Sequence, residues 1–300
     1  MKKKKNSKFI RHLIIVLLVL GYYYIKDNEE SYSKKKEPQT EQIQEVSSDL
    51  SIHYIDVGQA DSILIKNKEY SMLIDAGNNE DGPLLVNYLE ELNINKIDYV
   101  VGTHPHEDHI GGLDDIINNL EVKEVLLPEA MTTTKTFEDV LDAIENKELE
   151  ITVPTIGEKF TLGETSFEVI YTGTGEKDLN EASIILKMEF GNHSYLFTGD
   201  TTEEVEKTIL DKNIDIDVLK VAHHGSRYSS CTEFLNLATP KYAIISAGEK
   251  NSYGHPEIET INRLKEHTEN IYITKDLGTI VLTSDGSNIK INNIKTNTNG

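Results

Sequence analysis

The chain has 300 residues, enough for one sizeable domain with accessory segments, and a formal net charge of −21. Its first 36 residues hold 10 Lys and Arg against 3 Asp and Glu, which leaves 20 against 48, a net charge of −28, in the rest. An acidic body disfavours a protein that coats nucleic acid, and the single cysteine, Cys231, excludes a disulfide framework and a Cys-rich zinc module. Any metal site must therefore use histidine and carboxylate ligands.

The N-terminal segment has the order of charged and apolar residues that is typical of an export signal. Six basic residues precede the apolar run LIIVLLVLGYYYI at 13–25, and no small-residue cleavage site follows it. We expect residues 1–26 to be an uncleaved signal-anchor that crosses the cell membrane once, with the body on the extracytoplasmic side. The alternative is a peripheral or buried helix, because a spanning helix needs roughly 20 apolar residues. Residues 27–49, rich in Glu, Lys, Ser and Gln, are predicted to be a disordered tether.

The body, residues 50–292, changes from closely spaced strands to alternating strands and helices. Short β-type runs at 51–57, 62–66 and 71–75 come first. Further strands are expected at 97–102, 123–128, 159–162, 165–171, 182–190, 193–199, 217–222 and 242–248, and helices at 84–92, 110–120, 137–146, 203–212, 232–238 and 257–267, before two closing strands and a polar tail at 293–300. This order predicts two mixed sheets with outer helices, a four-layer α/β sandwich.

The densest cluster of metal-binding residue types is the segment THPHEDHIGG. His104, His106, Asp108 and His109 fall within six residues directly after a predicted strand. Two imidazoles at i and i+2 of an extended segment can bind one ion, while the carboxylate and the third imidazole reach a second. The cluster therefore predicts a site for two divalent ions, with Zn²⁺ as the default for His and Asp ligands and Mn²⁺ as the alternative.

This cluster resembles the HxHxDH signature of the metallo-β-lactamase superfamily, which implies an αβ/βα sandwich and a hydrolytic function. Asp75 in IDAG resembles the superfamily's upstream aspartate, which orients the metal loop, and Asp200 in FTGD resembles the aspartate that bridges two metals. Three further segments resemble the soluble domain of the ComEC family of competence proteins: HYIDVGQADSILI at 53–65, DVLKVAHHGSRYSS at 217–230 and NSYGHP at 251–256.

One ligand of the superfamily has no counterpart in this chain. Many members take a further histidine from the segment between the main motif and the TGD aspartate, and here DLNEAS at 178–183 occupies that position. His193, on a turn, is interpreted as structural. We expect a histidine of HHGS to replace the missing ligand, with His224 favoured as the ligand and His223 as its partner or as an acid, and the reverse assignment stays open.

The second ion needs one more ligand beside Asp108 and His109. His255 in GHP follows the next predicted strand and is expected to supply it, the alternative being an ordinary loop histidine. The resemblance implies that a metal-bound hydroxide attacks an ester or phosphoryl centre, with Asp108, Asp200 and His223 as the catalytic residues. Substrate-binding roles are expected for residues beside these motifs, namely Ser226, Arg227, Asn251, Tyr253, Gln59 and Asp61.

The leading functional hypothesis is an extracytoplasmic hydrolase of phosphodiester-type substrates, with nucleic acid among the candidate substrates. The alternatives are a cell-surface phosphocholine or wall-polymer esterase, and a non-catalytic competence or envelope partner. A β-lactamase matches less well, because the three further segments resemble a different subgroup. The complete HPHEDH, TGD, HHGS and GHP set argues against a protein that only binds.

Overall fold

A computed structural model of the chain describes residues 49–175 and 177–294. The expected signal-anchor and all but the last residue of the expected tether lie outside these residues. Among the described residues, no helix is both long enough and apolar enough to cross a bilayer.

The first sheet has eight strands in the order β15-β14-β1-β2-β3-β4-β5-β6. Its strands are β1 (Leu50–Tyr54), β2 (Ser62–Asn67), β3 (Tyr70–Ala76), β4 (Lys96–Val101), β5 (Glu121–Leu126), β6 (Ile151–Thr152), β14 (Thr279–Ser284) and β15 (Ile289–Ile294). Pairing is antiparallel from β15 to β3 and parallel from β3 to β6. The change comes where helices begin to connect the strands, because a parallel pair needs a crossover.

The second sheet has seven strands in the order β13-β12-β11-β10-β9-β8-β7. Its strands are β7 (Lys159–Leu162), β8 (Thr165–Tyr171), β9 (Ile185–Phe190), β10 (His193–Phe197), β11 (Val218–Lys220), β12 (Tyr242–Ile245) and β13 (Ile271–Ile273). This sheet also changes from antiparallel, β7 to β10, to parallel, β10 to β13. The parallel strands of both sheets point their carboxyl ends at loops that carry the histidine motifs.

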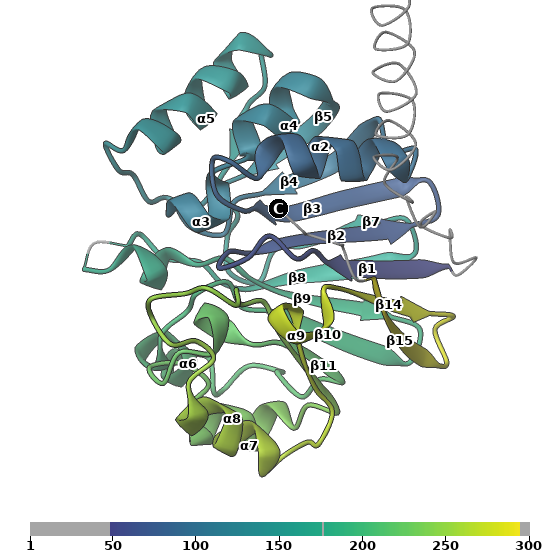
Figure 1. Ribbon diagram of the computed structural model, residues 1–300, viewed down its shortest axis with the longest axis vertical. Helices are drawn as coiled ribbons and strands as arrows, with labels where there is room; N and C mark the ends of the chain where they lie inside the picture. The colour runs from purple at the N-terminus through teal and green to yellow at the C-terminus, as the bar shows by residue number, and fades with distance from the viewer. Residues whose placement is uncertain (1–48, 176, 295–300) are drawn as a thin grey trace, which may run out of the picture. The chain divides into compact units, whose positions relative to one another are not determined.

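Helices cover the outer face of each sheet, so the predicted two-sheet α/β sandwich is confirmed (Figure 1). Over the first sheet lie α2 (Gly82–Glu91), α4 (Leu113–Asn119) and α5 (Lys135–Asn146); over the second lie α6 (Glu203–Thr208), α7 (Thr232–Ala238) and α8 (Ile258–Lys265). Inward-facing side chains of both sheets, among them Tyr54, Phe167 and Phe197, form the buried core between them. A second cluster joins the outer face of the second sheet to its helices.

Several elements differ from the sequence-based expectation. The helix expected at 110–120 is two helices, α3 (Glu107–Ile110) and α4, because the backbone leaves the helical conformation at Gly112, with φ of −93° and ψ of 5°. The strand expected from residue 182 begins at Ile185, since the preceding residues form the 3₁₀ helix η1 (Leu179–Ala182). Three closing strands replace the two expected, with a short helix α9 (Thr274–Leu277) after β13, and β15 ends at Ile294, past the expected domain end at 292.

Candidate metal centre

The histidine motifs meet where parallel strands of the two sheets end. Asp75 is the next-to-last residue of β3, and the HPHEDH segment follows β4. Asp200 follows β10, and His224 lies on the 3₁₀ helix η2 (Ala222–Gly225) after β11. Ligand sites of open α/β sheets lie at the carboxyl ends of strands, because loops from several strands converge there. The topology thus brings together side chains that are more than 100 positions apart in the chain.

Asp75 holds His109 and the loop before it. One carboxylate oxygen accepts the backbone N–H of Thr103 at 2.8 Å, and the other accepts the Thr103 hydroxyl at 2.8 Å and His109 Nδ1 at 2.8 Å. Because Nδ1 donates to this carboxylate, His109 Nε2 is left to face the cavity. Asp75 therefore orients the metal loop, as a carboxylate behind a metal-binding histidine does.

His104 and His106 converge on one point. The Nε2 atom of the buried His104 lies 3.0 Å from Nδ1 of His106, and the hydroxyl of Thr103 lies 3.2 Å from the other ring nitrogen of His104. The ring of His104 also lies 4.1 Å, between centroids, from the ring of His109. The imidazole pair is therefore adjacent to the second group of ligands.

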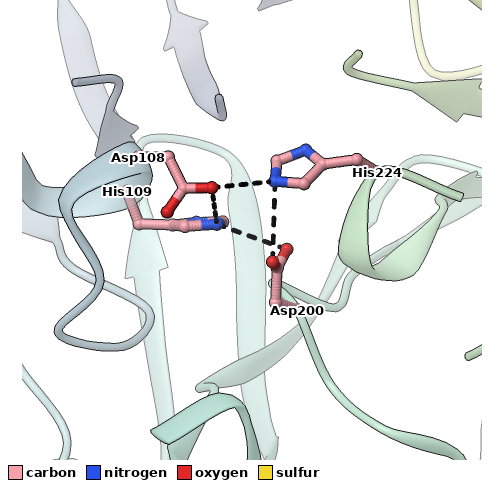
Figure 2. A group of neighbouring side chains, drawn as sticks. All are labelled: Asp108, His109, Asp200 and His224. Atoms are coloured by element: carbon pink, nitrogen blue, oxygen red, sulfur yellow. Dashed lines mark hydrogen bonds and ion pairs between the residues drawn. The ribbon is translucent and has the colours of Figure 1, made fainter. Parts of the chain in front are cut away.

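Asp108, His109, Asp200 and His224 form that second group (Figure 2). His109 Nε2 lies 3.3 Å from Asp200 Oδ1, and His224 Nε2 lies 3.3 Å from Asp108 Oδ2 and 3.5 Å from Asp200 Oδ2. Ligand atoms 2.0–2.2 Å from a tetrahedral ion are about 3.3–3.6 Å apart. His109 Nε2 and Asp200 Oδ1 are also buried without a hydrogen bond in the described part of the chain. Both observations fit a divalent ion.

A strained backbone places His224 in this group. His223 and His224 both have left-handed conformations, with φ of 50° and 53°, and Gly225 follows at 83°. Left-handed residues other than glycine are uncommon, and two in succession persist only where the surroundings fix them. His223 N–H donates to the Gly199 carbonyl at 3.1 Å, and His224 Nδ1 donates to the Ser246 carbonyl at 3.0 Å. The second bond leaves His224 Nε2 to face the carboxylates.

The buried carboxylates favour positive charge at the centre. Burial lowers the pKa of His104 well below its usual range, so this imidazole is neutral, the form that binds metal. Burial also acts to lower the pKa values of His109 and His224, but the carboxylates outweigh it, chiefly Asp200. The pKa of His109 rises well above its usual range, and that of His224 rises to about 10. A divalent cation supplies the same positive charge.

A cavity of about 340 Å³ opens onto these ligands. It is lined by residues of both sheets' loops: Gln59, His106, Glu107, Asp108, Asn180, Asp200, His223, His224, Tyr253 and His255. A larger cleft of about 720 Å³ shares Gln59, Glu107, Asp108 and Tyr253 with it and continues past Glu80, Asp81 and Lys250. The combined lining is acidic, with one lysine against several carboxylates.

Comparison with known proteins identifies the family. The family model of the metallo-beta-lactamase superfamily matches residues 55–249, about two thirds of the chain. This chain belongs to the metallo-beta-lactamase superfamily. Both the fold and the HPHEDH segment thus agree with the resemblance found in the sequence.

Curated relatives of this superfamily member include competence proteins, which confirms the resemblance of the three further segments. ComE operon protein 3 of Bacillus subtilis (strain 168) is 30% identical over 256 residues, covering 78% of this chain and 33% of that protein. Competence protein ComA of Neisseria gonorrhoeae is 26% identical over 217 residues, covering 71% of this chain and 29% of that protein. The aligned region therefore spans about a third of the relatives' own length.

A solved structure shares the fold of the superfamily member. The structure of Igni18, described as a novel metallo hydrolase from Ignicoccus hospitalis KIN4/I, matches with a TM-score of 0.51 at 17% identity. The match covers 77% of this chain and 98% of that one.

His255 lies on the cavity wall but outside the ligand group of this metallo-beta-lactamase fold. Its Nδ1 faces Gln59 Nε2 at 3.3 Å, and its ring stacks on Tyr253 at 5.5 Å between centroids. Burial and the neighbouring His224 and His223 lower the pKa of His255 to about 4. The structure thus brings His224, rather than His255, to Asp108, His109 and Asp200.

The residues expected to bind substrate divide into two sets. Gln59, Asn251 and Tyr253 line the cavity or the cleft, and the Asn251 amide also holds its own loop by donating to the carbonyls of Gly248 and His255. Ser226, Arg227 and Asp61 do not line either space. The Ser226 hydroxyl accepts the backbone N–H of Tyr228, the Arg227 guanidinium pairs with Glu257 and Glu259, and Asp61 pairs with Lys220.

Sequence reasoning missed three residues that shape the centre. Thr103 joins Asp75 to His104, and Lys220 lies under the site with its Nζ 2.6 Å from Asp61 Oδ2. Asn180 lines the cavity from the segment where the superfamily's further histidine is absent. The sequence did indicate this position, because the segment DLNEAS occupies the place of the missing histidine. Lys220 gave no comparable indication, since its partner is 159 residues away.

Proposed function

We propose that this superfamily member is an extracytoplasmic, divalent-metal-dependent hydrolase of phosphodiester-type substrates that uses a binuclear site. The supporting observation is the adjacency of two ligand groups, the pair His104 and His106 and the cluster around Asp200, at the base of one cavity. Two ions in such a site are about 3.5–4 Å apart in phosphatases and nucleases. The donor set of imidazoles and carboxylates suits Zn²⁺ or Mn²⁺.

When bound, the two ions lower the pKa of a water molecule towards neutrality and offset charge on the substrate oxygens. The chain's own residues can orient the substrate and protonate its leaving group. His223 lies on the cavity wall with 26% of its side chain exposed and with Nε2 3.6 Å from Asp200 Oδ2, so it can give a proton to the leaving oxygen. Gln59 and Tyr253 flank both the cavity and the cleft, where they can orient the rest of the substrate.

A phosphocholine or wall-polymer ester is the second candidate, and the cleft favours it over a polyanion. Glu80, Asp81 and Glu107 line the cleft together with Tyr253, a residue that is 69% exposed. A cationic headgroup is attracted by carboxylates and by an aromatic face, whereas a long anionic strand is repelled by the same surface. The third candidate, a protein that binds without turnover, would keep the ions and lack activity.

Turnover assays on the purified full chain separate the three candidates. The substrates are bis-p-nitrophenyl phosphate, p-nitrophenyl phosphocholine and single-stranded DNA, the last because relatives are named competence proteins. Phosphodiester cleavage that a chelator abolishes and Zn²⁺ or Mn²⁺ restores would support the proposal. Two bound ions without cleavage of any of the three would refute it in favour of the binding partner.

The extracytoplasmic location is proposed from the sequence alone, from the Lys-rich start and the apolar run at 13–25. The expected result is full-length protein in the membrane fraction, with residues 50–300 digested by protease added outside intact cells. Intact protein in a cytosolic fraction would contradict it.

A further inference from the structure

Asn180 lines the cavity together with His106, on a loop held by hydrogen bonds. It lies on η1, between β8 and β9, and its backbone N–H donates to Asp178 Oδ1 at 3.0 Å. The same loop is bonded to both metal motifs. Ile184 N–H donates to the Thr103 carbonyl at 3.0 Å, and the Ser183 hydroxyl accepts the backbone N–H of Asp200 at 3.1 Å. The loop therefore fixes Asn180 relative to the neighbours of His104 and to Asp200.

The side-chain carbonyl of Asn180 is buried without a partner. The residue is only 9% exposed and lines the 340 Å³ cavity together with His106, Asp200 and His223. Its Oδ1 atom is buried and makes no hydrogen bond within the described residues. Buried polar atoms in native proteins nearly always have a hydrogen-bond or ion partner, so this oxygen is free to accept a water molecule or an ion in the cavity.

An ion held by the imidazole pair would need further donors. His104 and His106 offer two donor atoms. Asp200, which lies in the neighbouring cluster with Asp108, His109 and His224, would offer a third if it bridged the two ions. In this chain the segment that gives other members a histidine gives an amide instead. An amide oxygen is a harder and weaker donor than imidazole. A site completed by it should bind its ion less tightly and discriminate less against Mn²⁺.

We propose that Asn180 Oδ1 is a direct ligand of the ion bound by His104 and His106, which makes this the weaker and more exchangeable of the two metal sites. The inference rests on the proposed binuclear site.

The test compares the wild-type full chain with Asn180→Ala and Asn180→His, after treatment with a chelator. The control is Asn119→Ala, at an exposed asparagine whose amide bonds only to its own helix at Asp115 in the described structure. Calorimetric titration with Zn²⁺ and with Mn²⁺ gives the affinity of each site, elemental analysis gives the number of ions, and the visible spectrum of the Co²⁺ form reports the ligand set.

For Asn180→Ala we expect one site weakened at least about tenfold and the other unchanged. For Asn180→His we expect Zn²⁺ affinity at or above that of the wild type, a larger preference for Zn²⁺ over Mn²⁺, and a shifted Co²⁺ spectrum. Asn119→Ala should match the wild type in all three measurements. If Asn180→Ala fails to fold, as judged by circular dichroism, the spectrum of the histidine variant decides.

Two wild-type sites in Asn180→Ala, or an unchanged Co²⁺ spectrum in Asn180→His, would overturn the inference while leaving the proposed hydrolase intact. Conversely, metal binding that depends on Asn180 in a protein that cleaves no substrate would sustain the inference and refute the hydrolase. A wild-type chain that binds no second ion would overturn both.

Discussion

Replacing Lys220 by methionine should lower the free energy of unfolding by about 3–5 kcal/mol, because it leaves the buried Asp61 carboxylate without the lysine that pairs with it. The Lys220 side chain is 0% exposed and that of Asp61 2%, and Nζ lies 2.6 Å from Oδ2. Burial acts to raise the pKa of Asp61, but Lys220 and His224 outweigh it and hold the pKa below its usual range. The carboxylate is therefore ionised in the folded protein at neutral pH.

The magnitude follows from the separation of the charges. At an effective dielectric constant of about 20, unit charges 2.6 Å apart attract by about 6 kcal/mol. Removing the lysine also removes the cost of burying its own charge, which brings the net loss to about 3–5 kcal/mol. Asp61 can relieve part of this loss by taking up a proton, so the loss should shrink as the pH falls below neutral.

Urea unfolding followed by circular dichroism, in the presence of a chelator, measures the effect without a contribution from bound metal. With a slope of about 3 kcal/mol/M, the midpoint should fall by about 1–2 M. The double variant Asp61→Asn with Lys220→Met has neither charge of this pair, so it should be markedly more stable than the sum of the single effects implies. A loss below about 1 kcal/mol in Lys220→Met, or strict additivity, would show that the pair does not act as argued.

Three further predictions concern the centre and its support. Asp200→Ala should bind at least one ion fewer and lose most turnover while remaining folded, whereas a turn aspartate would change stability by no more than about 0.5 kcal/mol and leave the rate unchanged. His224→Ala should lose metal and activity together in elemental and kinetic assays, and His193→Ala, its control, should leave both near the wild-type values. Burial raises the pKa of Glu206 to about 7 from 4.5, so the stability that its protonated form provides is complete below about pH 4.5 and is lost as the pH rises to about 7. Glu206→Gln should therefore reduce the difference in unfolding free energy between about pH 5 and pH 8 by about 2–3 kcal/mol, and an unchanged difference would contradict the raised pKa.

The sequence predicted the sandwich and the main ligand cluster because both depend on local spacing. Hydrophobic periodicity located most strands, and three histidines with an aspartate in six residues left little room for a purely structural reading. Short elements were not predicted, because they contain too few residues to show a hydrophobic periodicity. The two-residue β6 and the helix η1 owe their conformations to a partner strand and to the cap at Asp178.

The roles of individual histidines could not be read from the sequence in the same way. His224 and His255 both follow parallel strands of one sheet, so topology alone gives them equal access to the ions. The left-handed backbone at 223–225 directs His224 inward, and such a conformation has no marker in the sequence apart from Gly225. The role of Arg227 could not be read from the sequence either. Its guanidinium, which was expected to contact phosphate, pairs instead with Glu257, a residue 30 positions further along the chain.

The acidic lining of the cleft also affects how metal ions enter the centre and how products leave it. Glu80, Asp81 and Glu107 create a negative potential at the entrance, which raises the local concentration of divalent cations and repels small anions. Ion uptake by the apo-protein should therefore be fast and should slow as added salt shortens the Debye length, about 10 Å at 0.1 M. The same field would push an anionic product outward, so, if the proposed phosphodiester hydrolysis is correct, the protein should resist inhibition by its phosphate product.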